Sequence, residues 1–328
     1  MQKDTLIKSA AVSLCFIAGI LIGRYLVPTV RVSDTIPGSE IRIQGKFTNP
    51  LLECEVGGNS IASEKQDFTP ELREFIDLLG ETNHFENVAV YFRDLNNGPV
   101  IGINQNETYA PASLLKIPVM IAYLRWAEDD PRVLDEVIMY EKPVDLGYSQ
   151  EFAPLVPLEI GETYSAKELI ENMIRYSDNQ ALLLLFNRLP STYQEELFRL
   201  VGIDTGLITN PTATLSVRRY SIFFRILFNA SFLSRTHSEY ALKLLTETTF
   251  TNGLRAGVPE KVDVAHKFGE RKIENGLQQF HDCGIVYYPE HPYMLCIMTR
   301  GSNSDTLINA IQDISEFVYT QIDEQYGL

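Results

Sequence analysis

The sequence predicts a mixed α/β fold of the α+β type, in which one antiparallel sheet is flanked by terminal helices and carries an inserted all-helical lobe. Strand-forming runs occur near both ends of the body, whereas helical patterns dominate its middle part. This order places the outer runs in one sheet and the helices between them in a separate lobe. Residues 67–328, in a chain that is 45% hydrophobic overall, are numerous enough to bury a full core.

The elements follow from local pattern and turn chemistry. Residues 88–94 and 100–104 form a predicted hairpin, because Asn96-Asn97-Gly98 between them favours a tight turn. Ser165 is a candidate cap for the helix that follows it. The predicted helices are 71–79, a helix that starts at Ser113 and continues through 117–124, 166–176, 180–189, 191–201, 217–228 and 307–319. The predicted strands are 88–94, 100–104, 262–268, 284–288 and 293–299.

Three short motifs occur once each, in the order Ser113-Leu114-Leu115-Lys116, Ser177-Asp178-Asn179 and Lys267-Phe268-Gly269. Ser113 and Lys116 are three residues apart at the start of a predicted helix, so their side chains share one face. The Lys116 amine can accept the serine proton if its pKa is well below the ordinary lysine value. Burial beside a second cation has this effect, and Lys267 is the candidate cation. Together the motifs predict a serine acyl-transfer enzyme.

In these motifs the chain resembles the penicillin-recognising serine hydrolases, the group that contains class A β-lactamases and DD-peptidases. The resemblance extends from about residue 68 to the C-terminus and implies a β-lactamase/transpeptidase-like fold, with the active-site cleft between sheet and helical lobe. It implies that Ser113 is the nucleophile, Lys116 its base partner and Ser177 a proton shuttle to the leaving nitrogen. It also implies that Asn179 contacts a substrate amide and that Lys267 lies on an edge strand facing the serine.

The third motif and the residue after it form the predicted substrate-binding strand. The resemblance implies an oxyanion hole made by the backbone N–H groups of Ser113 and Glu270, and such donors usually make the largest single contribution to the rate. Phe268 stands where the family has threonine or serine before Gly269, and phenylalanine cannot donate a hydrogen bond to a substrate carboxylate. Carboxylate recognition would then depend on Lys267 alone. Phe268→Thr is therefore expected to improve acylation by carboxylate-bearing substrates.

The sequence offers no candidate for the glutamate that assists deacylation in class A β-lactamases. Glu195 and Glu196 lie inside the predicted helix 191–201, and the segment 202–214 contains Asp204 as its single acid. A general base typically contributes a factor of about 10² to 10⁴ in rate, so a long-lived acyl-enzyme is expected.

Three functions are compatible with these motifs. The first is a serine hydrolase of the class A β-lactamase-like group, which hydrolyses a β-lactam or related cell-wall amide through an acyl-serine intermediate. The second is a DD-peptidase or transpeptidase acting on peptidoglycan stem peptides, which the missing glutamate favours and Phe268 disfavours. The third is a weakly catalytic or non-catalytic envelope protein that binds peptidoglycan or another protein.

The N-terminal segment predicts a membrane anchor. Lys3 and Lys8 precede an uncharged, mostly apolar run over 9–23, which 25–27 extend beyond Arg24. Counted through Val27 it spans about 28 Å as a helix, close to the thickness of a bilayer core, and the Arg24 side chain can reach the membrane surface. The two lysines favour a cytoplasmic N-terminus, which places the body of this single-pass protein on the outer face of the cell membrane. A cleaved signal peptide is the alternative, although no clean small-x-small cleavage site is present.

The predicted division of the chain is 1–32 as signal anchor, 33–66 as linker and 67–328 as hydrolase domain. The linker mixes Pro, Gly, Ser and charged residues with few long apolar runs. Within the domain the sheet lobe covers about 67–112 and 255–328 and the helical lobe about 113–254.

Composition argues against several kinds of partner. The formal net charge of −15 argues against nucleic acid. The five histidines show no metal-binding spacing such as His-x-x-x-His, and neither a metal nor another cofactor is predicted. The sequence contains no signal for the oligomeric state.

Cys283 and Cys296 are expected to remain free, buried thiols. A turn centred on Glu290-His291 would place Cys283 opposite Met298, with Cys296 on the diagonal and generally too far away for a disulfide. With Cys54 they make an odd number outside the anchor, which does not suggest a disulfide framework.

Overall fold

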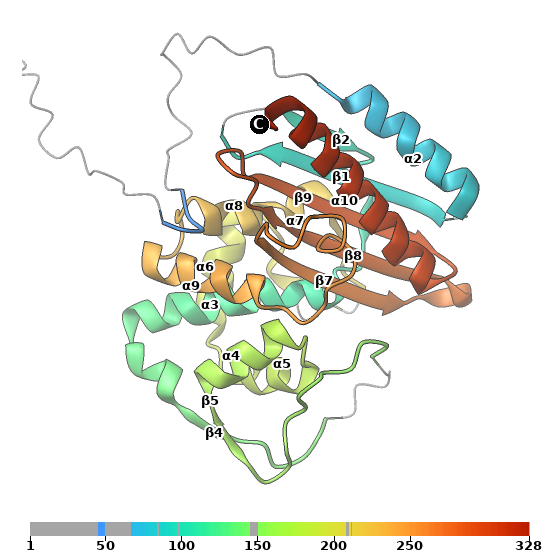
Figure 1. Ribbon diagram of the computed structural model, residues 1–328. Coiled ribbons are helices and arrows are strands. Elements are labelled where there is room, and N and C mark those ends of the chain that lie inside the picture. The colour runs from blue at the N-terminus through green and yellow to red at the C-terminus, as the bar shows by residue number, and fades with distance from the viewer. Residues whose placement is uncertain are drawn as a thin grey trace, which may run out of the picture. The chain divides into compact units, whose positions relative to one another are not determined.

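A five-stranded antiparallel sheet with strand order β2-β1-β9-β8-β7 forms the centre of the fold (Figure 1). The computed structural model describes residues 45–49, 67–83, 85–96, 99–144, 150–207, 210 and 212–327. The strands of the sheet are β1 (Phe85–Asp94), β2 (Val100–Ile103), β7 (Val264–Lys272), β8 (Gln278–Val286) and β9 (Tyr293–Gly301). The predicted hairpin is confirmed, with Val90 opposite Ile103. β1 also pairs with β9, which joins the two ends of the body in one sheet, as predicted.

Two hydrophobic layers cover the two faces of this sheet. The outer layer lies under helices α2 (Thr69–Asn83) and α10 (Ser304–Tyr326) and receives Val90 and Phe92 of β1 (Figure 1). The inner layer lies between the sheet and the helical lobe and receives Tyr91 of the same strand. Successive residues of a strand point to opposite faces, so an apolar run of this kind buries both sides of the sheet.

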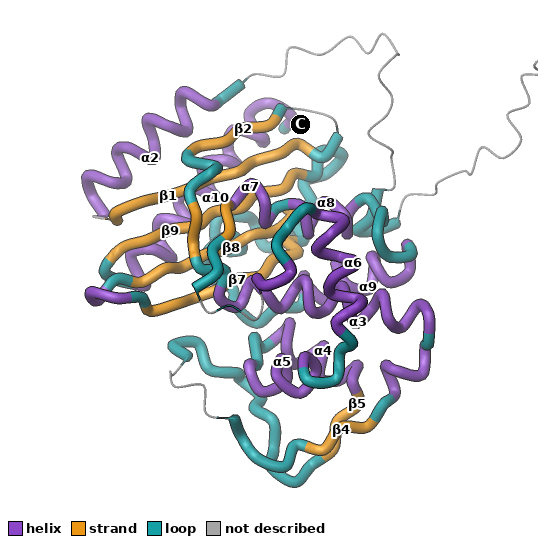
Figure 2. Tube along the Cα trace, turned by 180° about the vertical axis from the view of Figure 1, so that it is seen from behind, coloured by secondary structure: helices purple, strands orange, loops and turns teal. Residues whose placement is uncertain are grey.

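The helical lobe lies against the inner face of the sheet, which Figure 2 shows from the side opposite to α10. Its helices are α3 (Lys116–Asp129), α4 (Ala166–Arg175), α5 (Asn179–Phe186), α6 (Ser191–Val201), α7 (Val217–Tyr220), α8 (Ile222–Phe228) and α9 (Arg235–Thr246). Ser165 forms a capping box with Glu168 at the start of α4, which confirms the predicted cap. The predicted helix 217–228 is divided at Ser221, whose hydroxyl donates to the backbone oxygen of Arg218 at 2.8 Å and competes with helical bonding.

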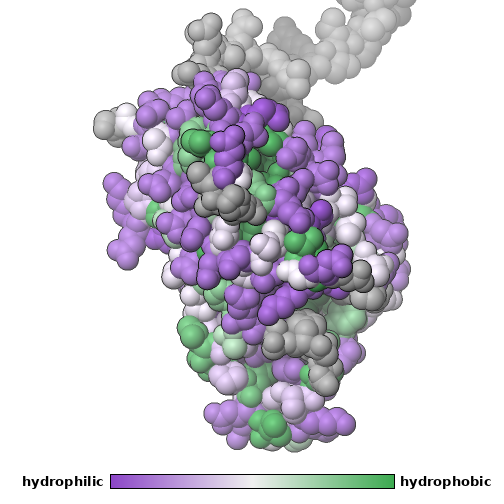
Figure 3. All heavy atoms as spheres, turned by 90° about the vertical axis from the view of Figure 1, so that its right-hand side faces the viewer, coloured by the Kyte–Doolittle hydropathy of each residue, from purple (hydrophilic) through white to green (hydrophobic). Residues whose placement is uncertain are grey.

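The remaining elements are short. Two-stranded ladders join β3 (Thr108–Tyr109) to β6 (Leu215–Ser216) and β4 (Val137–Met139) to β5 (Thr163–Ser165). The 3-10 turns are η1 (Ala112–Leu115), η2 (Pro131–Asp135), η3 (Thr205–Leu207) and η4 (Glu274–Gly276). We call the described residues 137–144 and 150–165, which include β4 and β5, the arm. It carries exposed apolar side chains, namely Val137, Met139, Val144, Leu155, Val156 and Ile160. Figure 3 shows apolar spheres at the lower end of the molecule, where Figure 1 places this arm.

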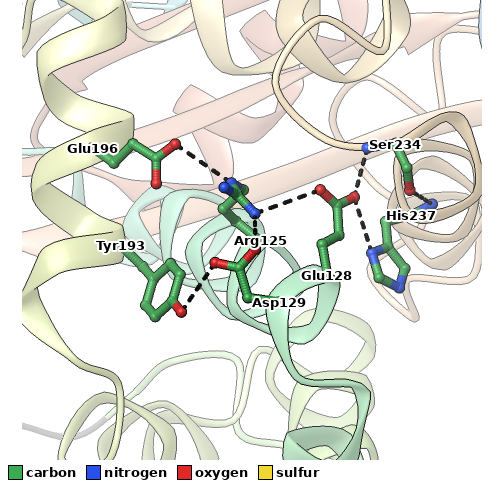
Figure 4. A network of polar contacts seen from close by, with 7 residues as sticks. All are labelled: Arg125, Glu128, Asp129, Tyr193, Glu196, Ser234 and His237. Atoms are coloured by element: carbon green, nitrogen blue, oxygen red, sulfur yellow. Dashed lines mark hydrogen bonds and ion pairs between the residues drawn. The ribbon is translucent and has the colours of Figure 1, made fainter.

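A network of charged side chains joins α3, α6 and α9 near the surface (Figure 4). Arg125 donates to Asp129 at 2.9 Å and to Glu196 at 3.4 Å. The neighbouring Glu128 carboxylate lies 3.1 Å from Nδ1 of His237. Pairs near the surface contribute about 0.2 to 1 kcal/mol each, so the network adds little to the stability of the fold.

Residues 45–49, which fall within the predicted linker, dock onto the domain. Phe47 is 5% exposed and packs edge-on against Tyr287. The Glu239 carboxylate accepts hydrogen bonds from the backbone N–H groups of Phe47 and Thr48 at 2.8 and 3.1 Å. The predicted anchor lies outside the described residues. Among the helices that the structure describes, none is long and apolar enough to cross a membrane.

The expectation of free thiols is wrong, because Cys283 and Cys296 form a disulfide between β8 and β9. Val286 lies opposite Tyr293, so the turn between the strands is centred on Pro289-Glu290, one residue earlier than expected. This register places the two cysteines directly opposite each other, with Cα atoms 4.0 Å apart.

Candidate active site

Ser113 lies in η1, directly before α3, so the predicted serine helix begins as a 3-10 turn. Pro118 has no N–H group to donate to the carbonyl of Leu114, four residues earlier. The hydroxyl of Tyr220 donates to that carbonyl instead, at 2.9 Å. Helix α7 therefore helps to hold the turn that presents Ser113, a contact for which the sequence contains no local signal.

Lys116 is fully buried, and its amine is surrounded by hydrogen-bonding oxygens. Nζ lies 2.7 Å from Oγ of Ser113, 2.9 Å from the backbone oxygen of Ser177 and 2.6 Å from Oδ1 of Asn179. Burial, assisted by the charge of Lys267, holds the pKa of Lys116 well below the ordinary lysine value. A neutral amine at hydrogen-bond distance from the Ser113 hydroxyl can act as its base.

The second motif forms the turn between α4 and α5. Oδ1 of Asp178 accepts hydrogen bonds from the backbone N–H groups of Gln180 and Ala181 at 2.6 and 3.0 Å, and so caps α5. Ser177 adopts the left-handed region with φ of 55°, a costly conformation for a residue other than glycine. This backbone directs the Ser177 hydroxyl into the site and not toward the helix end.

Lys267 lies on β7, which is an edge strand of the sheet, and its side chain is fully buried in the site. Its Nζ is 2.9 Å from Oγ of Ser177, which is also 3.1 Å from Nζ of Lys116. Burial lowers the pKa of Lys267 to about 7, against the opposing charges of Asp282 and Glu270. The Ser177 hydroxyl thus lies between two amines whose pKa values are both lowered by burial.

Gly269 allows β7 to approach the turn that carries the nucleophile. A Cβ atom at this position would lie 3.1 Å from the backbone N of Leu114 and 3.1 Å from the backbone O of Pro111. Glycine is the residue that permits such a close approach between two backbone segments. The contact places the two residues of the predicted oxyanion hole, Ser113 and Glu270, beside each other in the fold.

A cavity of about 630 Å³ opens at this position. Ser113, Asn179 and Glu270 line it, together with Gln150 and Glu151, for which sequence analysis gave no role. A volume of this size is typical of a pocket for a small organic ligand. The predicted site residues that the structure brings together are Ser113, Lys116, Ser177, Asn179, Lys267, Gly269 and Glu270.

The Phe268 side chain is the exception among the predicted site residues. It is 4% exposed and belongs to the outer layer, on the opposite face of the sheet from the inner layer. Its ring stacks on Phe250 with centroids 4.2 Å apart and on Phe280 with centroids 5.8 Å apart. Its contact with the site is through Lys267, whose Nζ lies 4.0 Å from the centroid of the Phe268 ring.

The acids of the cavity differ from those considered in the sequence. Among the described residues that line the cavity, the carboxylates are those of Glu151 and Glu270. Burial raises the pKa of Glu270 above its usual value, although hydrogen bonds from two backbone N–H groups oppose this shift. Glu196 points to the surface network of Figure 4, and Asp204 accepts a hydrogen bond from the N–H group of Gly206 at 2.7 Å. Neither lines the cavity.

Within the part of the chain that the structure describes, no cluster of His, Cys, Asp and Glu side chains could hold a metal ion. His266, the residue before Lys267, is buried and its Nδ1 lies 2.9 Å from Oδ1 of Asp282. The side chains gathered around Ser113 carry hydroxyl, amine, amide and carboxylate groups.

Comparison with known proteins identifies the family. The model of the beta-lactamase enzyme family matches residues 71–322. The beta-lactamase of Bacillus amyloliquefaciens is 26% identical over 276 residues, which cover 79% of this chain and 86% of that protein. The beta-lactamase of Bacillus subtilis (strain 168) is 31% identical over 127 residues, 38% of this chain and 39% of that protein.

Solved structures share the fold. The structure of PBP-A superposes with a TM-score of 0.64 at 24% identity and covers 77% of this chain and 96% of that one. A class A beta-lactamase from Mycobacterium abscessus gives a TM-score of 0.64 at 20% identity, covering 76% of this chain and 99% of that one. The family match, the fold and the meeting of the three motifs lead to one conclusion: the chain belongs to the beta-lactamase enzyme family and is a β-lactamase-like serine hydrolase.

Proposed function

We propose that this protein hydrolyses a β-lactam or a related cell-wall amide through an acyl-Ser113 intermediate. The observation that carries the proposal is the buried Lys116 amine, 2.7 Å from the Ser113 hydroxyl and with a lowered pKa. A lysine in this state is a base for the serine and not a cation that merely pairs with it.

In the first step, Nζ of Lys116 accepts the Ser113 proton while Oγ of Ser113 bonds to the carbonyl carbon of the substrate. The negative oxygen that develops faces the backbone N–H groups of Ser113 and Glu270. The Ser177 hydroxyl, 3.1 Å from Lys116 and 2.9 Å from Lys267, gives its proton to the leaving nitrogen as the C–N bond breaks and takes in return the proton that Lys116 accepted from Ser113. Asn179, which lines the cavity, contacts an amide of the substrate.

Water then hydrolyses the acyl-Ser113 ester, and this step is expected to be slow. The segment 202–214 holds no glutamate to activate the water, and in the cavity one oxygen of Glu270 accepts from two backbone N–H groups and one oxygen of Glu151 from the Ser304 hydroxyl. Loss of a general base typically costs a factor of about 10² to 10⁴.

The slow second step favours a DD-peptidase or transpeptidase as the second candidate, in which an amine can replace water as acceptor of the acyl group. The L158E mutant of PBP-A, which has a similar fold with a TM-score of 0.63 at 22% identity, forms an acyl-enzyme complex with penicillin-G. That protein supports the view that a chain of this fold can be trapped at the acyl stage.

The experiment is a time course of intact mass for the full chain mixed with benzylpenicillin, beside Ser113→Ala as matched control. An adduct that depends on Ser113 and clears quickly supports β-lactam hydrolysis. An adduct that persists supports the DD-peptidase reading. Absence of any adduct on the wild-type chain contradicts acylation by β-lactams and favours an envelope binding protein.

We also propose that the protein is a single-pass membrane protein whose catalytic domain faces the outside of the cell. The positive N-terminus and the mostly apolar run that ends at Val27, with Arg24 as its one charge, support this topology. The buried Cys283–Cys296 disulfide agrees with it, because such bonds persist in oxidising compartments. Protease added to intact spheroplasts should digest the domain, and a domain that stays intact until the cells are lysed would contradict the proposed side of the membrane.

A further inference from the structure

A short segment of the arm crosses to the sheet beside the cavity. We call Gln150–Phe152 the strap. Oε1 of Glu270 on β7 accepts hydrogen bonds from the backbone N–H groups of Glu151 and Phe152 at 2.9 and 3.2 Å. The Glu151 carboxylate in turn accepts from the hydroxyl of Ser304, at the start of α10, at 2.9 Å. The strap is thereby joined to two elements of the sheet lobe.

The strap also contacts the second motif. Nε2 of Gln150 donates to the backbone oxygen of Ser177 at 3.1 Å, the oxygen that also accepts from Nζ of Lys116 at 2.9 Å. Gln150 and Glu151 both line the cavity in which Ser113 lies. An acyl donor bound at Ser113 will therefore meet the strap as one wall of its pocket.

The ring of Phe152 is seated in the outer layer, among three other rings. Its centroid lies 5.2 Å from that of Phe250, 5.7 Å from Phe268 and 5.8 Å from Phe280, each in an edge-on arrangement. Edge-on contacts at these distances are favourable for aromatic pairs. Phe268 thus forms part of the seat for the strap, which gives a physical reason for phenylalanine in the third motif.

We propose that Glu270 is a positioning residue, whose carboxylate holds the strap in place as the wall of the substrate cavity while Phe268 seats it from behind. The part that concerns substrate depends on the proposed function. The backbone of Glu270 is fixed separately, because it pairs with Phe280 in the β7–β8 ladder. Loss of the carboxylate should therefore disturb substrate binding and leave the predicted oxyanion N–H group in place.

The first test needs no substrate. Hydrogen exchange of the Glu151 and Phe152 amides is measured in the full chain, in Glu270→Ala and in Glu270→Gln. Removing the acceptor should speed exchange of both amides by at least about tenfold, whereas glutamine retains an acceptor oxygen and should preserve most of the protection. Unchanged exchange in Glu270→Ala would overturn the proposal.

The second test separates binding from chemistry. Stopped-flow acylation by benzylpenicillin gives the dissociation constant of the first complex and the limiting acylation rate. Glu270→Ala and Phe152→Ala should raise the dissociation constant by about tenfold while the limiting rate changes by less than about threefold, and Glu270→Gln should have a smaller effect. A fall in the limiting rate with an unchanged dissociation constant would overturn the proposal, because Glu270 would then act on the chemical step.

Glu141→Ala is the matched control, since Glu141 is an exposed acid on the same arm and should leave both measurements unchanged. If benzylpenicillin does not acylate even the wild-type chain, the proposed function fails for β-lactams. The exchange experiment then still decides whether Glu270 positions the strap.

Discussion

Lys267 and Phe268 are neighbours on β7 whose side chains have different main partners, although Nζ of Lys267 lies only 4.0 Å from the centroid of the Phe268 ring. The amine of Lys267 meets Ser177 on the catalytic side of the sheet, among buried polar groups that are joined by short hydrogen bonds. The Phe268 ring lies in the outer layer, among stacked and edge-on aromatic rings. The hydrogen bonds of Lys267 serve proton transfer, whereas the ring contacts of Phe268 serve packing, and the two groups touch where the amine lies over the ring. Consecutive residues of one motif can therefore have different roles, because side chains alternate along a strand.

Lys116→Ala tests the catalytic side and should have the largest effect. Acylation by benzylpenicillin should fall by about 10² to 10⁴, because the base that accepts the Ser113 proton is lost. The rate is measured by intact mass, with the exposed Lys243→Ala as control. Acylation within a factor of about ten of the wild-type rate would assign the proton to another group.

Phe268→Thr tests the packing side. Loss of the ring from the outer layer should lower the free energy of unfolding by about 3 kcal/mol, as for other buried aromatic residues. The expectation drawn from the motif, faster acylation by carboxylate-bearing substrates, is tested with the same variant, and the outer-layer position of the ring argues against such a gain. Urea unfolding beside Phe92→Ala, a buried ring elsewhere in the same layer, provides the matched comparison. Faster acylation of Phe268→Thr by benzylpenicillin would show that the threonine hydroxyl reaches the substrate.

The pH dependence of the free energy of unfolding tests whether the buried Lys267 amine is neutral in the folded protein. The folded pKa of Lys267, about 7, is below the ordinary value of 10.5, so between these values unfolding takes up a proton. The free energy of unfolding should therefore rise with pH in this window, by at most about 1.4 kcal/mol per pH unit for one such group. Urea unfolding at about pH 7 and about pH 9 should show a smaller rise for Lys267→Met than for the wild-type chain. Equal slopes would mean that Lys267 keeps its proton in the folded protein.

Glu196→Gln should have the smallest effect, since Glu196 belongs to neither side of the sheet. Its partly exposed ion pair with Arg125 contributes about 0.2 to 1 kcal/mol, and high salt should reduce the difference from the wild-type chain. Acylation should not change. A loss of more than about 2 kcal/mol would indicate that the network of Figure 4 holds the helical lobe together more strongly than such exposed pairs do.

The sequence predicts the catalytic side better than the packing side. Each motif contains the residue types that the chemistry needs, and the side chains of Ser113, Lys116 and Ser177 meet as their motifs suggested. Side chains alternate along a strand, so Phe268 is expected on the face opposite to that of Lys267. A motif specifies residue types and does not specify which face each side chain occupies. The fold class followed from the order of strand-forming and helix-forming runs, and the boundaries of α6 matched the predicted 191–201.

The strap and the disulfide could not be predicted for different reasons. Glu151 and Glu270 are 119 residues apart, and no local pattern encodes a contact between an arm and a strand at that separation. The disulfide depended on the centre of one turn, where a shift of one residue moves Cys296 from a diagonal position to a position opposite Cys283. Register at this level is decided by the loop and by tertiary packing together.

The close approach at Gly269 limits how the active site can evolve. Any side chain at this position would meet backbone atoms of Leu114 and Pro111 at 3.1 Å, so most substitutions must move β7 away from the nucleophile. Glu270 and Gln150, in contrast, line an open cavity. Descendants of this protein that acquire new substrates should therefore carry their mutations in the strap and at position 270, with glycine retained beside the serine.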